Sequence, residues 1–205
     1  MQDYVIELHA TWTRGLPKVR ETSLNIIYMK FADIPKFPHS SYRINVDLDH
    51  VERALEHWDE PASGSPLILN PEWQRGHVWT KKQQTSYMEY MLKGGNTGKE
   101  IYFNCSSWGG GFNTPIYCVD GLQRLSAALA FIRNEIPAFG FLCKDYEDRL
   151  RMSGVGFFFN MLQVKSKKEL LNIYIDFNSG GTPHKPKEIA RIIELQKNTD
   201  PSETV

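Results

Sequence analysis

The chain has 205 residues, of which 41% are apolar and 12% aromatic, enough for one substantial core. Lysine plus arginine and aspartate plus glutamate each number 24, which excludes a globally basic nucleic-acid binder, so any contact with DNA must come from a local patch. The three cysteines, Cys105, Cys118 and Cys143, lack metal-ligand spacing and indicate buried thiols in a reducing compartment. Without an apolar signal region or a membrane-length apolar run, we expect a cytoplasmic protein of a bacterial or phage-infected host cell, with no membrane partner.

The predicted elements alternate irregularly along the chain. Residues 1–41 are expected as an irregular N-terminal extension, because Pro35 and Pro38 interrupt its apolar groups. Hydrophobic periodicity then predicts strands at 41–46, 67–70, 100–106, 116–120 and 156–164, and helices at 47–58, 80–95, 122–134, 166–178 and 186–198. This order does not fit a doubly wound sheet, so the pattern predicts a compact α+β domain with a mixed sheet and peripheral helices.

The first candidate cluster is PEWQRGHVWT, where Gln74 and Arg75 follow a predicted strand and Trp79 precedes a helix. Its ordinary interpretation is a surface arginine beside a core tryptophan. His77, between Arg75 and Trp79, could act as an acid or a base, but a surface histidine is the favoured interpretation. The glycine-rich segment 109–111 lacks the lysine of a P-loop and precedes a strand, which favours a hairpin.

The second cluster is VDGLQR, where a strand runs into Asp120 and Gly121 and a helix begins with Gln123 and Arg124 in its first turn. An arginine there meets the positive end of the helix dipole, at a cost of about 0.3–1 kcal/mol unless an anion is shared. The ordinary interpretation is an N-cap by Asp120 with Arg124 reaching to solvent.

The third cluster is FNSGGTP, whose Asn178, Gly180 and Gly181 would form a helix C-cap in the ordinary interpretation. Together the three clusters supply two arginines, two glutamines, an asparagine and glycine N–H groups, which are the donors that phosphate oxygens require. They also supply one aspartate that would hold Mg²⁺ or accept a proton. The combination predicts that the anion shared by Arg124 is a phosphate.

The order of WQRGHVW, VDGLQR and FNSGGTP resembles the N-terminal domain of GmrSD-type modification-dependent restriction enzymes, a branch of the ParB/sulfiredoxin-like superfamily. The family's central motif reads Asp-Gly-Gln-Gln-Arg, and here Leu122 replaces its first glutamine. The third motif continues with His184 and Lys185 where the family has leucine and serine. The resemblance implies a ParB/sulfiredoxin-like nucleotide-binding domain at 42–195, followed by a C-terminal tail at 196–205.

The resemblance also implies a nucleotide site made of the positions that match the family's motifs. The implied cofactor-binding residues are Gln74, Arg75, Gly121, Asn178 and Gly181, and the implied catalytic residues are Asp120, Gln123 and Arg124. In this hypothesis Arg75 and Arg124 hold the β/γ-phosphates of ATP or another NTP, while Gln123 and the Gly121 N–H orient an oxygen. Asp120 binds Mg²⁺ or activates the attacking hydroxyl or water.

Three functional hypotheses follow. The first is an NTP-dependent phosphotransferase or NTPase acting at DNA, such as a phage-type kinase that phosphorylates a hydroxymethylated base, with Trp73, Trp79 and Trp108 available to stack on an extruded base. The second is a non-catalytic subunit that senses nucleotide or modified DNA and partners or antagonises a restriction nuclease. The third is a base-processing enzyme such as a DNA glycosylase. A metal-dependent nuclease is not expected, because the six histidines form no pair with ligand spacing.

Overall fold

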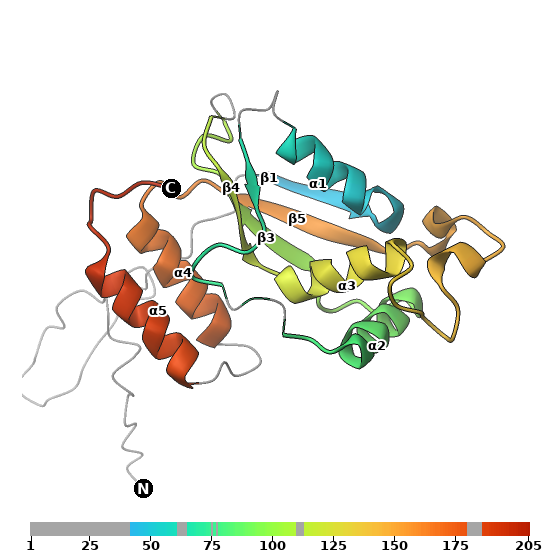
Figure 1. Cartoon of the computed structure of the whole chain (residues 1–205). Coiled ribbons are helices and arrows are strands. Elements are labelled where there is room, and N and C mark those ends of the chain that lie inside the picture. Colours follow the sequence, from blue (N-terminus) through green and yellow to red (C-terminus); the bar gives the residue numbers. More distant parts are fainter. Residues whose placement is uncertain (1–41, 61–64, 75, 77, 110–112, 180–185) are drawn as a thin grey trace, which may run out of the picture. The chain divides into compact units, whose positions relative to one another are not determined.

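A mixed sheet of five strands organises the described part of the chain (Figure 1). The computed structural model describes residues 42–60, 65–74, 76, 78–109, 113–179 and 186–205. The strand order is β1 (Tyr42–Asp47), β5 (Gly156–Leu162), β3 (Glu100–Asn104), β4 (Ile116–Asp120) and β2 (Leu67–Ile68). β1 is antiparallel to β5 and β3 to β4, whereas β3 is parallel to β5 and β2 to β4. The predicted α+β class with a mixed sheet is confirmed.

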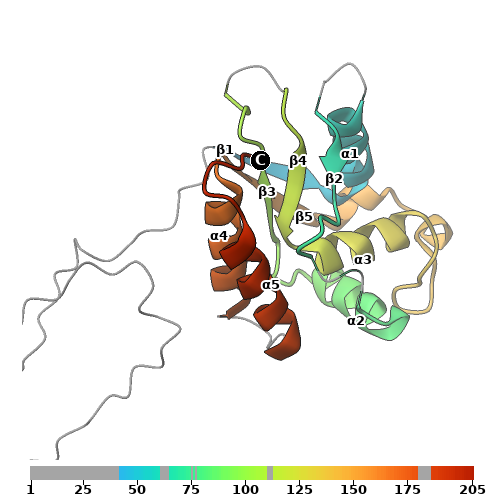
Figure 2. The same ribbon diagram turned by 60° about the vertical axis from the view of Figure 1, so that its left-hand side comes forward.

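Helices cover both faces of this sheet (Figure 2). The helices that contribute to the core on one face are α1 (Val51–Asp59), α2 (Lys81–Leu92) and α3 (Leu122–Ile132). Those on the opposite face are α4 (Lys167–Ser179) and α5 (Pro186–Asn198). Within the described residues there are also three short 3-10 helices: η2 (Leu48–His50), η4 (Cys143–Asp145) and η5 (Leu150–Ser153).

Strand alternation divides the apolar residues between two cores. Phe103 and Phe159 are fully buried on the α1 face, where the Trp58 ring lies edge-on to Phe103 with their centroids 5.0 Å apart. Val119 and Leu162 belong to the second core, beneath α4. Because successive side chains of a strand point to opposite faces, a single sheet can supply both cores. The sequences of β3, β4 and β5 are therefore nearly continuous runs of apolar residues.

Local signals explain the helix bounds. Thr80, the first residue of the predicted helix, caps α2: its Oγ1 accepts from the Gln83 N–H, while the Gln83 side chain accepts from the Thr80 N–H at 2.9 Å. The predicted helix at 47–58 is instead split into η2 and α1, and Asp47 makes no side-chain cap. α3 is apolar around most of its circumference, which fits its position between the sheet and α2.

The segment 196–205, expected as a tail, packs onto the fold. α5 continues to Asn198, and the chain then returns so that the Val205 N–H donates to the Lys165 carbonyl at 3.0 Å. The Val205 side chain is buried in the second core. None of the helices in the described residues has the length and apolar character needed to cross a bilayer.

Candidate functional site

The VDGLQR motif forms the turn between β4 and α3. Asp120 is the last residue of β4, and Gly121 is the N-cap of α3 with a left-handed φ of 107°. In the ladder Tyr102 pairs with Asp120 and Phe103 with Cys118, so Val119 is an extra residue on β4. A Cβ on Gly121 would lie 2.6 Å from Ile101 Cδ1, so both conformation and packing require glycine there.

The anion beside Arg124 in this structure is the carboxylate of Asp120. Arg124 Nη2 donates to Asp120 Oδ2 at 2.5 Å, and the two side chains are 21% and 36% exposed. Among the described residues no side chain, that of Asp120 included, donates or accepts a capping hydrogen bond at the N-terminus of α3. An ion pair at a partly open helix N-terminus leaves uncapped backbone N–H groups next to a guanidinium.

Gln123 joins the second motif to the first. Its Oε1 accepts from the backbone N–H groups of Val78 and Trp79 at 2.9 and 3.0 Å, and its Nε2 donates to the Gly76 carbonyl at 3.0 Å. One amide side chain thus holds three backbone groups of the loop before α2. The structure thus brings Gln123 of the second motif together with Gly76, Val78 and Trp79 of the first, and the partners of Gln123 are backbone groups.

Gln74 has a similar role along β4. Its Nε2 donates to the carbonyls of Cys118 and Val119, each at 3.1 Å, just past the two residues at which β2 pairs with β4. The side chain thereby continues the hydrogen bonding of the β4 edge where β2 has ended. On the other side, Tyr174 of α4 donates to Gln74 Oε1 at 3.5 Å, which is a long contact.

The third motif lies at the end of α4. Asn178 remains inside the helix, where its Nδ2 donates to the Tyr174 carbonyl at 2.7 Å. The neighbouring Phe177 ring lies 4.8 Å from the ring of Tyr102, the residue paired with Asp120. α4 thus reaches the strand beside the Asp120 turn, although Gly181, Arg75 and His77 lie outside the described residues.

Two tyrosines outside the three motif clusters, Tyr102 and Tyr87, flank the ion pair. Burial raises the pKa of Tyr102, and the nearby Glu100 and Asp120 carboxylates raise it further. Burial also raises the pKa of Tyr87, which Arg124 partly opposes, and the Tyr87 hydroxyl donates to the Gly98 carbonyl at 2.7 Å. No local pattern marks these residues, because strand register and the packing of α2 bring them to the site.

The tryptophans expected to stack on a base have different environments. Trp73 is only 3% exposed, and its ring centroid lies 5.2 Å from that of Tyr117, so it is part of the second core. Trp108 packs against Trp58 with ring centroids 5.7 Å apart. Trp79 is half-buried, and its ring centroid lies 5.4 Å from that of Tyr87. It follows directly after the loop that Gln123 holds. Trp79 is thus connected directly to the VDGLQR turn, through its N–H to Gln123 Oε1.

Arg191 of α5 also supports the first motif. Its guanidinium donates to the carbonyls of Glu72 and Trp73 at 3.0 and 3.2 Å. The turn before Gln74 is therefore fixed from α5, while Gln74 itself is fixed to β4. The start of the first motif is therefore held by two elements, because α5 binds the carbonyl of Trp73 and β4 binds the side chain of Gln74.

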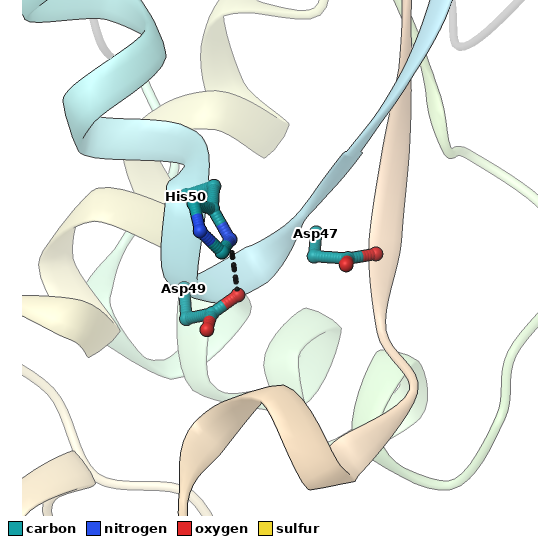
Figure 3. Close-up of side chains that lie close together, drawn as sticks. All are labelled: Asp47, Asp49 and His50. Atoms are coloured by element: carbon teal, nitrogen blue, oxygen red, sulfur yellow. Dashed lines mark hydrogen bonds and ion pairs between the residues drawn. The ribbon is translucent and has the colours of Figure 1, made fainter.

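A group of potential metal ligands occurs away from this turn, at the end of β1. Ligand atoms of Asp47, Asp49 and His50 lie within 4.8 Å of one another, and His50 Nδ1 is 2.8 Å from Asp49 Oδ1 (Figure 3). Asp47 and His50 are exposed and Asp49 is half-buried, as is common for acidic surface groups without a metal. Asp120 is not part of such a group among the described residues, so by itself it offers one carboxylate.

Comparison with known proteins gives no family assignment. No protein-family model matches this sequence, and no curated protein and no solved structure matches it.

Proposed function

We propose that this chain is an NTP-dependent phosphotransferase or NTPase that acts at DNA, with a ParB/sulfiredoxin-like fold and a hydroxymethylated base as acceptor. The observation that carries the proposal is the Asp120–Arg124 pair at the uncapped N-terminus of α3. Free N–H groups at a helix N-terminus together with a guanidinium form a favourable environment for phosphate oxygens.

The loop of the first motif completes this environment. Gln123 holds the backbone of Gly76, Val78 and Trp79 next to the first turn of α3. The amides of Gln74 and Gln123 are engaged with the backbone, so we assign them the role of positioning residues. Arg124, the Gly121 turn and Arg75 remain as the groups for direct phosphate contact in this proposal.

In the proposed reaction Arg124 exchanges partners. When the nucleotide binds, its guanidinium turns from Asp120 to the γ-phosphate oxygens, which spreads positive charge over the group that is transferred. The released Asp120 carboxylate then accepts the proton of the acceptor hydroxyl. As the bond from this oxygen to the γ-phosphorus forms, the bond to the β-phosphate oxygen breaks and the nucleoside diphosphate leaves.

The turn offers Mg²⁺ one protein carboxylate, so the ion would fit only together with a bound nucleotide. Mg²⁺ commonly binds one or two carboxylates and completes its shell with phosphate oxygens and water. Asp120, once Arg124 has turned to the phosphate, would supply a single carboxylate oxygen. When bound, the ion would neutralise charge on the β- and γ-phosphates.

A second candidate function is a non-catalytic subunit that senses nucleotide or modified DNA and works with a partner nuclease. The specific observation in its favour is that Asp120 already neutralises Arg124 and that both glutamines already bind backbone groups. A site satisfied in this way suits recognition as well as turnover. It predicts binding of NTP or DNA without movement of phosphate.

The test is incubation of the protein with γ-labelled ATP, Mg²⁺ and DNA that contains either ordinary or hydroxymethylated bases. Label in the modified DNA alone supports the kinase, and label in free phosphate supports the NTPase. Nucleotide or DNA binding without label movement supports the sensing subunit. A protein that binds neither nucleotide nor DNA contradicts both, and abasic sites in the modified DNA would indicate the glycosylase instead.

A further inference from the structure

A cavity lies at the opposite end of α3 from the Asp120 turn. Its volume is about 240 Å³, and its apolar wall consists of Leu92, Phe131, Phe139, Tyr146 and Leu150. Phe131 stands ten residues after Gly121, or about 15 Å along the helix axis at 1.5 Å per residue. The cavity is therefore separate from the proposed phosphate site.

The wall of this cavity is held in place by specific contacts. The Tyr146 hydroxyl donates to the Ala138 carbonyl at 2.7 Å, and the Tyr146 ring lies edge-on to Phe131 at 6.2 Å. Phe139 has a left-handed φ of 49°, and its N–H donates to Glu89 Oε1 at 2.9 Å. Although it is fixed in this way, the Phe139 side chain is 44% exposed. An aromatic surface that is built and left partly open is typical of a ligand site.

Two opposite charges line the same cavity. Asp148 and Arg149 are both exposed, and neither forms an ion pair or side-chain hydrogen bond with another described residue. A carboxylate and a guanidinium beside an aromatic wall match a ligand that carries an ammonium and a carboxylate next to an apolar group. This pattern of charges distinguishes a zwitterion from a simple hydrocarbon or a simple anion.

We propose that this cavity binds a free apolar α-amino acid, with aromatic side chains preferred. The ligand's ring lies among Phe131, Phe139 and Tyr146, its carboxylate binds Arg149, and its ammonium binds Asp148. Size supports this class, because a cavity of about 150 Å³ is sufficient for benzene and drug-sized ligands use about 300 Å³ or more. Ring contacts of the edge-on kind add to the burial of apolar surface.

Cys143 provides a direct measure of occupancy. Its thiol lines the cavity and is partly exposed, whereas Cys105 and Cys118 are fully buried. The experiment measures the rate of Cys143 alkylation by iodoacetamide in the full chain, with L-phenylalanine, glycine, 3-phenylpropionate or 2-phenylethylamine present. We expect saturable protection by phenylalanine, protection about tenfold weaker by the two probes with one charge, and none by glycine. Equal protection by the singly charged probes, or none by phenylalanine, overturns the proposal.

Charge-removing variants test the assignment of the two polar residues. Arg149→Gln and Asp148→Asn should each weaken the apparent affinity for phenylalanine about tenfold, measured by protection of Cys143 and by titration calorimetry. Both side chains are exposed, so folding is expected to be retained. The matched control is Lys144→Gln, an exposed charge in the same segment that does not line the cavity. Unchanged affinity in both variants, or the same loss in the control, contradicts the proposal.

Discussion

Arg124 and Asp120 form an ion pair across the turn from β4 to α3, with 2.5 Å between Nη2 and Oδ2. The pair resolves an electrostatic conflict, because a cation in the first turn of a helix is otherwise unfavourable. It also joins a potential proton acceptor to a potential phosphate ligand in one partly open position. The function proposed for this turn requires Arg124 to exchange the Asp120 carboxylate for the oxygens of a phosphate.

Gly121→Ala should destabilise the fold more than Gly140→Ala. Both glycines have positive φ, 107° and 84°, which costs roughly 1–2 kcal/mol for alanine. At Gly121 the new Cβ also meets Ile101 at 2.6 Å, whereas at Gly140 no atom lies within 4 Å, so overpacking adds about 1–3 kcal/mol at Gly121 alone. Urea denaturation measures both free energies of unfolding. Equal losses for the two variants would show that β3 does not approach the turn as described.

Gln123→Ala should release the loop before α2. The variant removes three hydrogen bonds to the backbone of Gly76, Val78 and Trp79 and should lower the free energy of unfolding by about 1–3 kcal/mol. Hydrogen exchange of the Val78 and Trp79 amides, followed by nuclear magnetic resonance, should accelerate. The matched control is Gln163→Ala, whose side chain is exposed. Retained protection of both amides in the variant would refute the positioning role of Gln123.

Thiol labelling of the native protein should modify Cys143 alone. Cys105 and Cys118 are completely buried, so the reagent cannot reach either thiol. Burial also strongly raises the pKa of the Cys118 thiol, which keeps it protonated and unreactive. Mass spectrometry after brief alkylation should find one adduct, and three after unfolding in denaturant. Rapid native labelling of Cys118 would mean that the β4 strand opens easily, which is inconsistent with its central position in the sheet.

Stability at high pH should depend on Tyr87. Burial raises its pKa above the ordinary value of 10.0, so above that pH the unfolded state loses the proton before the folded state does. The folded state then binds more protons, and the Tyr87 contribution to stability falls as pH rises. Denaturation at about pH 9 and about pH 11 should show a smaller decline for Tyr87→Phe than for the wild type. Tyr90→Phe is the control, because the hydrogen bond with the Thr97 hydroxyl lowers the pKa of Tyr90. An equal reduction of the high-pH decline in both variants would contradict the role of Tyr87.

Local signals in the sequence were sufficient to predict most elements. Residues 186–198 form α5 with the predicted bounds, and Thr80 caps α2, because capping and periodicity act over a few neighbouring residues. β2 is shorter than expected, with two paired residues, since beyond them the Gln74 side chain takes over the bonds to β4. A side chain that substitutes for a strand leaves no periodic pattern.

The candidate site was only partly predictable for a related reason. The sequence places Asp120 and Arg124 four residues apart, but their contact depends on the left-handed φ of Gly121 at a strand-to-helix turn. Tyr102 lies opposite Asp120 because of the β3–β4 register, which non-local pairing determines. The resemblance implies that the second motif and the Gln74–Arg75 pair face one nucleotide, whereas the observed partners of Gln123 are backbone groups that no motif specifies.

The most direct test of the central claim compares label transfer from γ-labelled ATP to hydroxymethylated DNA by the wild type, Asp120→Asn and Arg124→Gln. The matched controls are Glu56→Gln and Arg53→Gln, which change exposed residues of α1. The partly open Asp120–Arg124 pair should contribute at most about 1 kcal/mol to stability, so both site variants should stay folded. Each site variant should lower the transfer rate by at least about 100-fold, while the controls should keep wild-type rates. Wild-type rates in folded Asp120→Asn and Arg124→Gln proteins would contradict the proposed function.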